Sequence, residues 1–467
     1  MSATTEEDVP REGLAISSIL DTDLYKLTMQ CAVLDHYPDV DVVYSFTNRT
    51  PEMQLTKEAF TWLDMQVKGL ADVHLTEEEA DWLDENCPYL SGEYLTYLEK
   101  FRFKPKDNIK LDLNPPANSL DDKMTGTLSV EIRGQWLDTI LYEIPLLALI
   151  SEAYFKFVDK DWSYDGQIEK AMQKGLQLIE HGCSFSEFGS RRRRSYHTHD
   201  LVVQGLLAAQ AEADTNGKGW TGKLAGTSNV DMARRWGLTP IGTVAHEWFM
   251  AVAVIEKEGY KQANYNAMRA WCSTFGNGVL AIALTDTFGT PSFLKAFAAP
   301  TPVIEDVATN GNKPHHEYIT FAEAFAGVRQ DSGDPLEFIA MMRDWYTSRG
   351  MCMDGKPPKT IVFSDSLNVE KCFKYHDATV NVGLIPSFGI GTFLTNDFER
   401  QSKPGEKSVP LNIVIKLSEA YGKPTVKLSD NKGKNTGDDE LIKEVKRLVE
   451  YEERDWAGGD EQHRWDQ

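Results

Sequence analysis

The sequence lacks the cysteine pattern of a disulfide-stabilised protein. Its 467 residues include only six cysteines, and none of them forms a Cys-x-x-Cys pair. In a chain of this length, scattered cysteines indicate reduced thiols and exclude a disulfide framework. We therefore expect a cytoplasmic location, which can extend to the nucleus.

Long apolar runs and an excess of positive charge are also missing. No apolar run reaches the roughly 18 residues that a transmembrane helix needs, so we expect no membrane-spanning segment. Lys and Arg total 49 against 71 Asp and Glu, which gives a net charge of −22. Because an acidic chain repels nucleic acid and anionic membranes, we expect neither as a partner.

The apolar content is sufficient for a large core and two domains. Hydrophobic residues make up 41% of the chain, which suits a protein of this size. Residues 1–15 are acidic and are predicted to form a disordered tail, not a signal peptide. Residues 16–160 mix helices with strands and predict an N-terminal α/β domain. Residues 405–467 contain a predicted hairpin and a charged helix, and we expect them to return to that domain.

Between residues 161 and 404, short apolar strands alternate with helices. About seven βα units follow one another, and this alternation is typical of a parallel β/α barrel. The predicted strands are residues 183–187, 223–226, 240–244, 279–284, 324–329, 359–363 and 382–387. The fold class predicted from the pattern is therefore α/β, with a barrel as the catalytic domain.

His246 lies at a predicted strand-to-helix junction, after strand 240–244 and before a helix that opens at Glu247. A helix N-terminus attracts anions because unpaired N–H groups and the helix dipole point outward there. A neutral imidazole is also a nucleophile that can accept a phosphoryl group. The alternative is a histidine that only caps the helix or packs against it.

The other predicted strand ends favour the functional interpretation of His246. In a parallel barrel the active site lies at the carboxyl ends of the strands. Nearly all of these ends carry a charged or hydroxyl group directly after an apolar strand. These groups are the arginine run 191–194 and Ser228, His246, Asp286, Arg329, Asp331 and Asp365.

Three of these groups are the carboxylates of Asp286, Asp331 and Asp365. They could bind Mg²⁺ through water, hold ribose hydroxyls or position a base, and each could instead cap a helix. Magnesium usually takes one or two protein carboxylates and leaves the other positions to phosphate and water. The sequence does not identify direct metal ligands, and His197 and His199 lack a companion ligand motif.

Two further features predict anion binding. Gly389, Gly391 and Thr392 follow the last predicted strand, where phosphate sites often occur; the glycines would let N–H groups approach an anion. An ordinary tight turn is the alternative. In the arginine run 191–194, alternating side chains point opposite ways, so we expect one or two to enter the site and the others to bind surface acids.

Taken together, these stretches resemble the nicotinate phosphoribosyltransferases over nearly the whole chain. The matching motifs are residues 21–26, 44–49, 187–192, 226–229, 243–247, 329–335, 363–366 and 412–417. The resemblance implies an irregular β/α barrel with an α/β domain built from both ends of the chain. It also implies a reaction of NAD biosynthesis, in which nicotinate and phosphoribosyl pyrophosphate give nicotinate mononucleotide and pyrophosphate. This reaction would be coupled to ATP hydrolysis. We expect ATP as co-substrate and Mg²⁺ as cofactor, and we expect that the chain can form a homodimer.

The resemblance implies roles for the residues that hold the base. Tyr25 and Phe188 would sandwich the pyridine ring, with Tyr25 supplied by the same chain or by a neighbouring subunit. Arg191 and Arg329 would face the carboxylate or the phosphates. Ser228 replaces an aspartate of the nicotinamide-using relative, and this replacement removes a like charge near a carboxylate ligand.

The resemblance also implies roles around the phosphates. Asp331 and Asp365 would hold the ribose, and the Gly389–Gly391–Thr392 turn would hold the 5′-phosphate. His246 would become a phosphohistidine, while Glu247 would orient the imidazole or handle its proton.

Three alternatives remain from the sequence. The nearest is a phosphoribosyltransferase that acts on nicotinamide. A barrel aldolase for sugar phosphates would often need a Schiff-base lysine at a strand end, and none of the predicted ends has one. A non-catalytic nucleotide sensor is the third, and turnover of phosphoribosyl pyrophosphate would exclude it.

Overall fold

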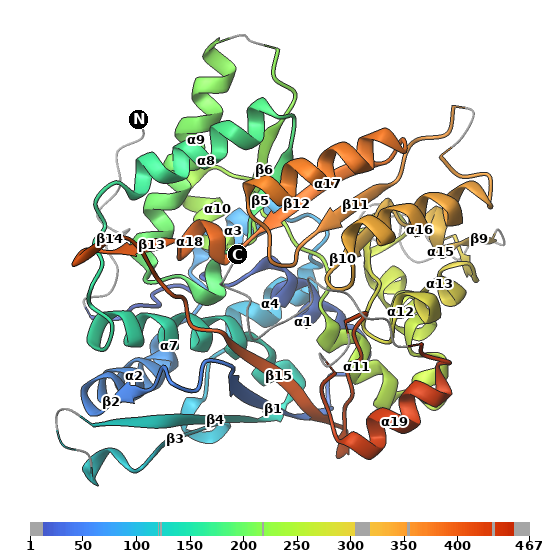
Figure 1. Cartoon of the computed structure of the whole chain (residues 1–467). Helices are drawn as coiled ribbons and strands as arrows, with labels where there is room; N and C mark the ends of the chain where they lie inside the picture. Colours follow the sequence, from blue (N-terminus) through green and yellow to red (C-terminus); the bar gives the residue numbers. More distant parts are fainter. Residues whose placement is uncertain are drawn as a thin grey trace.

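The computed structural model describes residues 13–119, 121, 124–216, 219–303, 318–352, 355–431 and 435–452. Its two largest sheets each have six strands, one antiparallel and one parallel (Figure 1). Most of the predicted tail, residues 1–12, lies outside the described residues. None of the helices in the described part of the chain combines the length and hydrophobicity that spanning a bilayer requires.

The antiparallel sheet joins the two ends of the chain. Its order is β16-β15-β1-β4-β2, and β3 pairs with β4. The strands are β1 (Asp41–Asn48), β2 (Leu55–Thr56), β3 (Ile109–Asn114), β4 (Thr125–Gln135), β15 (Ile413–Ala420) and β16 (Lys423–Pro424). β15 lies antiparallel beside β1 (Figure 1), so the C-terminal segment completes the sheet that the N-terminal segment begins.

Helices pack around this sheet. They are α1 (Leu24–His36), α2 (Lys57–Gly69), α3 (Glu77–Asn86), α4 (Gly92–Lys100), α5 (Pro105–Asn108), α6 (Trp136–Thr139) and α7 (Glu143–Phe157). From the C-terminal segment, α19 (Asp439–Leu448) lies instead beside the 3-10 turn Gly259–Lys261. A 3-10 turn, Ile140–Tyr142, separates α6 from α7. Pro145 lies in the first turn of α7, where its missing N–H has no intrahelical partner to lose.

The parallel sheet confirms the predicted α/β fold. Its order is β6-β5-β12-β11-β10-β7, and every neighbouring pair is parallel. The strands are β5 (Ser184–Glu187), β6 (Lys223–Thr227), β7 (Ile282–Leu284), β10 (Gly327–Gln330), β11 (Thr360–Phe363) and β12 (Ile385–Ile390). Six of the predicted strands therefore form.

Helices connect and cover these strands (Figure 1). They are α8 (Gln167–Glu180), α9 (Tyr196–Asn216), α10 (Val230–Trp236), α11 (His246–Ile255), α12 (Ala263–Phe275), α13 (Thr290–Phe297), α15 (Phe321–Ala324), α16 (Pro335–Thr347), α17 (Val369–Asn381) and α18 (Thr392–Thr395). Two short hairpins, β8 (Pro300–Pro302) with β9 (Tyr318–Thr320) and β13 (Phe398–Arg400) with β14 (Lys403–Ser408), lie outside the two large sheets.

The prediction of a strand over residues 240–244 is wrong, because this segment does not pair with the parallel sheet through a ladder of hydrogen bonds. It makes one isolated parallel bridge to β6, at Pro240, and the Thr243 hydroxyl donates to Ile282 O of β7 at 3.3 Å. The segment thus lies between the two outer strands without closing a hydrogen-bonded ring among the described residues. The start of α1 packs closely against this segment. A Cβ added to Gly242 would lie only 2.9 Å from Tyr25 N.

The segment before α1 crosses the ends of the parallel strands. Leu24 N donates to Ser228 O at 2.8 Å, and Val230 N donates to Thr22 O at 2.9 Å. These bonds join the first domain to the loop that follows β6. Because of them, the first turn of α1 is held at the carboxyl ends of the strands.

Candidate active site

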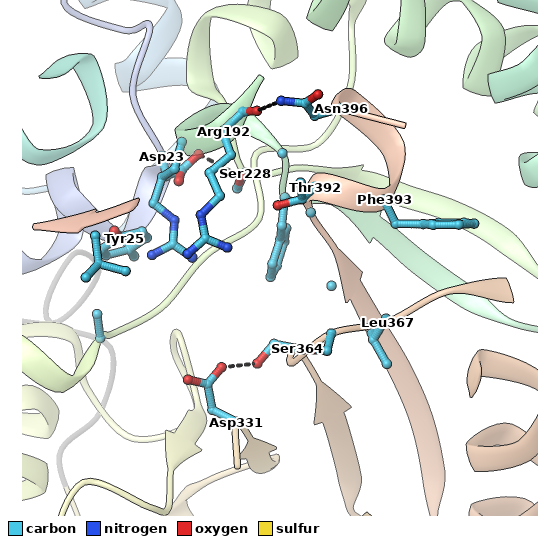
Figure 2. A pocket seen from close by; sticks show the side chains of 18 of the residues that line it. Asp23, Tyr25, Arg192, Ser228, Asp331, Ser364, Leu367, Thr392, Phe393 and Asn396 are labelled. Carbon is cyan, nitrogen blue, oxygen red and sulfur yellow. Dashed lines mark hydrogen bonds between the residues drawn. The ribbon is translucent and has the colours of Figure 1, made fainter. Parts of the chain in front are cut away.

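A cavity of about 790 Å³ opens at the carboxyl ends of the parallel strands (Figure 2). Most of the predicted site residues line it. They are Tyr25, Phe188, Arg191, Ser228, His246, Glu247, Arg329, Asp331, Gly389, Gly391 and Thr392. Asp286 and Asp365 are not among the lining residues.

One part of the cavity, which we call the base end, is formed by Asp23, Tyr25, Phe188, Arg191 and Ser228. Tyr25 and Phe188 of the same chain both line it. The Tyr25 hydroxyl donates to Glu143 Oε2 at 3.2 Å. The base end thus combines two aromatic rings with a guanidinium.

Asp23 is a lining residue that the sequence did not single out. It is 3% exposed, and its Oδ1 accepts a hydrogen bond from Ser190 Oγ at 2.6 Å. The same oxygen accepts from Ser228 Oγ at 2.7 Å (Figure 2). Burial raises the pKa of Asp23, against the opposing effects of the Ser190 hydrogen bond and the Arg191 charge. Asp23 is also the N-cap residue of α1, but its carboxylate makes no capping bond.

The position of Asp23 changes the interpretation of Ser228. A serine there was expected to keep the base end free of a carboxylate. Instead the Ser228 hydroxyl is bound to the Asp23 carboxyl, so an acidic group still lies beside the predicted substrate. Only the contact across two chain segments brings it there, and the sequence carries no signal for that contact.

The four arginines of the run 191–194 divide into two pairs. Arg191 and Arg192 line the cavity, and the Arg191 side chain is 47% exposed, with its guanidinium 3.8 Å from Glu143 Oε1. Arg193 is buried in a bidentate pair with Asp21 at 2.7 and 2.5 Å. Arg194 donates to Asn396 and Ser408 and lies over the Phe155 ring at 3.9 Å. The second pair therefore binds buried groups, not the surface acids that were expected.

At the other part of the cavity, which we call the histidine end, His246, Asp331 and Lys427 line the wall, and Asp286 and Thr287 lie behind them next to the imidazole. His246 is the first residue of α11, at the junction that the sequence predicted. Its Nδ1 lies 3.0 Å from Thr287 Oγ1 and its Nε2 lies 3.0 Å from Asp331 Oδ2. A neutral imidazole satisfies both contacts when Nε2–H donates to Asp331 and Nδ1 accepts from Thr287.

The pKa of His246 is lowered, first by burial and then by the charge of Lys427, while Asp286 and Asp331 act in the opposite direction. The neutral form, in which one ring nitrogen is unprotonated and can act as the nucleophile, is therefore favoured. Lys427 comes from the C-terminal segment, where Leu428 N donates to Thr287 O at 2.8 Å. No local motif indicated that this lysine reaches the site.

Asp331 contacts the imidazole in addition to lining the cavity. Its Oδ1 accepts from Ser364 Oγ at 2.6 Å, and Arg329 Nη2 lies 3.6 Å away (Figure 2). Burial would raise the pKa of Asp331, but the Arg329 charge and the His246 contact hold it well below its usual range. The carboxylate predicted to hold the ribose is thus the one that orients His246.

Glu247 does not have the predicted role of orienting the imidazole. Its carboxylate accepts from Lys26 Nζ at 2.5 Å, Tyr44 OH at 2.6 Å and Trp136 Nε1 at 2.6 Å. All three donors lie away from the His246 ring, because successive helical side chains point in different directions. Asp331 and Thr287 hold the imidazole instead.

Gly389, near the end of β12, and Gly391, directly after it, make room for an aromatic ring. A Cβ on Gly389 would lie 2.3 Å from the Phe188 ring, and a Cβ on Gly391 would lie 2.9 Å from Phe188 O. Their first structural consequence is therefore the placement of Phe188. Thr392 begins α18 and lines the cavity, and binding of the 5′-phosphate by this turn stays a prediction.

Asp286 lies behind the cavity wall. It is 1% exposed, its Oδ2 accepts from Ser332 Oγ at 2.5 Å, and its Oδ1 lies 3.7 Å from His246 Nε2 with no hydrogen-bond partner in the described part of the chain. His246, Asp286 and Asp331 are close enough to share a metal ion. Asp365 accepts from Ser366 Oγ at 3.0 Å, and Ser364 and Ser366 on either side of it line the cavity.

Comparisons with known proteins agree over almost the full length. Residues 20–151 match the nicotinate phosphoribosyltransferase (NAPRTase) N-terminal domain, and residues 183–453 match the nicotinate phosphoribosyltransferase (NAPRTase) family. A Schizosaccharomyces pombe protein named for the same activity is 48% identical over 93% of this chain and 98% of its own. The Saccharomyces cerevisiae nicotinate phosphoribosyltransferase is 46% identical over 96% and 99%. A crystal structure of the enzyme from that yeast superposes with a TM-score of 0.84 at 44% identity, covering 94% of this chain and 99% of that one.

Proposed function

The chain belongs to the nicotinate phosphoribosyltransferase family, and we propose that it makes nicotinate mononucleotide and pyrophosphate from nicotinate and phosphoribosyl pyrophosphate, as a step of NAD biosynthesis. The two family matches and the relatives at 46–48% identity support this activity. The alternatives of a sugar-phosphate aldolase and a nucleotide sensor have no comparable support.

The single observation that carries the proposal is the composition of the base end. Arg191 presents a guanidinium beside Tyr25 and Phe188, and among the described residues its nearest ion-pair partner is 3.8 Å away. Aromatic side chains suit a planar ring, and a guanidinium suits a carboxylate through paired N–H donors. Nicotinate combines these two features in one small molecule.

In the proposed reaction, the pyridine nitrogen attacks C1 of the phosphoribosyl group while the bond from C1 to the pyrophosphate oxygen breaks. The transition state resembles an oxocarbenium ion, so the protein contributes mainly by positioning the base and stabilising the departing pyrophosphate. Arg329 and Lys427 line the cavity beside Asp331 and His246 and would supply positive charge to the phosphates.

We further propose that ATP phosphorylates His246. An imidazole nitrogen attacks the γ-phosphorus, the bond to the β-phosphate oxygen breaks to leave ADP, and water later hydrolyses the N–P bond. Asp286 and Asp331 fit Mg²⁺, because Asp286 Oδ1 is buried without a partner among the described residues and carboxylate oxygens suit this ion. When bound, Mg²⁺ would neutralise phosphate charge. Homodimer formation and a cytoplasmic location stay predictions.

Pyrophosphate release tests the activity. The assay compares nicotinate, nicotinamide and quinolinate, each with and without ATP. We expect the highest kcat/KM with nicotinate and a further increase with ATP. Nicotinamide is the informative competitor, because the Asp23 carboxyl could accept a hydrogen bond from its amide group. An equal or higher kcat/KM with nicotinamide would contradict the proposed substrate.

A further inference from the structure

A buried lysine connects three segments below the cavity. Lys26 of α1 is 0% exposed, and its Nζ lies 2.6 Å from Glu143 Oε2 of α7 and 2.5 Å from Glu247 Oε2 of α11. The two carboxylates are themselves 11% and 8% exposed. One ammonium thus holds together two acids that would repel each other in a low-dielectric environment.

Each glutamate also adjoins a different part of the active site, Glu143 through side-chain contacts and Glu247 through its place in the chain. Glu143 Oε2 accepts from the Tyr25 hydroxyl at 3.2 Å, and Glu143 Oε1 lies 3.8 Å from Arg191. Glu247 follows His246 in the first turn of α11. A continuous path therefore runs from the aromatic ring and guanidinium of the base end, through Glu143, Lys26 and Glu247, to the backbone that carries the imidazole.

We propose that Lys26 is a positioning residue that couples the base end of the cavity to the histidine end. This inference rests on the proposed function, which places nicotinate at one end and phosphoryl transfer from ATP at the other. Lys26 does not line the cavity, and it acts through the two glutamates. With the ammonium in place, Tyr25 and the first turn of α11 are fixed relative to each other.

Removal of the ammonium would leave the two glutamates facing each other. Without the cation that they share, the carboxylates would have to separate or take up a proton, because burial and like charge both disfavour the ionised pair. Separation would move Glu143 relative to Tyr25 and Glu247 relative to its donors Tyr44 and Trp136, and protonation would weaken the same contacts. A single change would therefore disturb nicotinate binding and the use of ATP together.

The proposal also predicts that arginine cannot replace this lysine. The site is filled by a compact ammonium between two oxygen atoms, whereas a guanidinium is larger and planar. Lys26→Arg keeps the charge but changes the geometry, so we expect it to restore folding more fully than the coupling between the two ends.

The test compares Lys26→Met with a matched control. Tyr94→Phe removes the hydroxyl that donates to Gln30 Oε1 at 2.8 Å, which is another buried hydrogen bond of α1 and lies outside the path. For Lys26→Met we expect KM for nicotinate to rise about tenfold or more, with a smaller change in KM for phosphoribosyl pyrophosphate. We also expect more ATP to be hydrolysed for each nicotinate mononucleotide formed. Tyr94→Phe should lower the melting temperature and leave the KM for nicotinate and the ATP ratio unchanged.

Each outcome decides between the possibilities. If the wild-type protein releases no pyrophosphate with nicotinate, the proposed function falls. If the wild type is active and Lys26→Met keeps its KM for nicotinate and its ATP ratio, only the coupling is overturned. The coupling is also overturned if activity falls only in proportion to the unfolded fraction, while the folded fraction keeps its KM for nicotinate and its ATP ratio. Should Lys26→Met not fold, Glu143→Gln and Tyr25→Phe interrupt the same path from the base end, and an unchanged ATP ratio in both would contradict the proposal.

Discussion

The base end and the histidine end of the cavity differ in how their charged groups are satisfied. At the histidine end, His246 contacts Asp331 and Thr287, and Asp331 also contacts Ser364. At the base end, Arg191 is 47% exposed and makes no ion pair closer than 3.8 Å in the described part of the chain. The comparison indicates that the histidine end uses its charges to hold and tune the imidazole, whereas the base end reserves a positive charge for the ligand.

The strongest change in nicotinate binding is predicted for Arg191→Ala. Removing this guanidinium would leave the substrate carboxylate without its partner, and truncating one member of such a pair costs about 2–5 kcal/mol. We expect KM for nicotinate to rise accordingly, with little change in the melting temperature.

Arg193→Ala serves as the matched control for that prediction. Its guanidinium pairs with the buried Asp21 and not with the cavity, so its loss should destabilise the fold by about 3–5 kcal/mol. Urea unfolding and steady-state kinetics on both variants separate the two roles. A stability loss in Arg191→Ala as large as that in Arg193→Ala would contradict the distinction between them.

The next effect concerns the histidine end. Asp331→Asn removes the negative charge that accepts from His246 Nε2 at 3.0 Å, and a hydrogen bond to a charged group contributes about 1.5–3 kcal/mol. We expect the stimulation by ATP to fall by the corresponding factor, while KM for nicotinate changes little. Kinetics with and without ATP measure the ATP stimulation and the KM for nicotinate. A rise in KM for nicotinate alone would contradict the assignment of Asp331 to the histidine end.

A smaller effect is expected at Ser228. Ser228→Asp would place a second carboxyl beside Asp23, whose Oδ1 accepts from the Ser228 hydroxyl at 2.7 Å. The added charge should weaken the use of nicotinate by about 1–3 kcal/mol relative to nicotinamide. The ratio of kcat/KM for the two pyridines measures this change, and Ser228→Ala separates the added charge from the lost hydroxyl. An unchanged ratio in Ser228→Asp would show that the residue at this position does not discriminate between a charged and a neutral pyridine substrate.

The weakest effect is a pH shift in Lys427→Met. The charge of Lys427 lowers the pKa of His246, so it helps to keep the imidazole neutral at pH values at which an ordinary histidine would be protonated. Without that charge the pKa rises, and the imidazole becomes protonated at a higher pH. We therefore expect the acidic limb of ATP stimulation to move to higher pH, measured as the ratio of rates with and without ATP across the pH range. A shift to lower pH would contradict the assigned cause.

Local sequence signals predicted the parts of the fold that depend on neighbouring residues. An aspartate directly before a proline predicts a helix start, and Asp334 caps α16: its Oδ1 accepts from Leu336 N at 2.8 Å and Pro335 occupies the first helical position. The alternation of apolar strands with helices likewise predicted the parallel sheet. Strand ends with charged groups indicated where the cavity would lie.

Contacts between distant segments account for the rest. The segment 240–244 has the composition of a strand, but α1 packs against it, and the Thr28 hydroxyl donates to Thr243 O at 2.6 Å. Glu247 turns toward Lys26, which lies far from it along the chain. Asp23 and Lys427 reach the cavity from the two outer segments of the chain. No local spacing encodes such pairings, since they depend on how the first domain packs on the parallel sheet.

The proposed role of the histidine end requires that His246 accept the phosphoryl group of ATP, and labelling with γ-³²P-ATP measures this step itself. We expect an acid-labile, base-stable label on the peptide that contains His246, as is usual for an N–P bond. In His246→Ala the label and the ATP stimulation should vanish, while a slow ATP-independent transfer remains because the base end still positions nicotinate. Label found on a serine or aspartate, or a His246→Ala variant that ATP still stimulates fully, would contradict phosphorylation of His246.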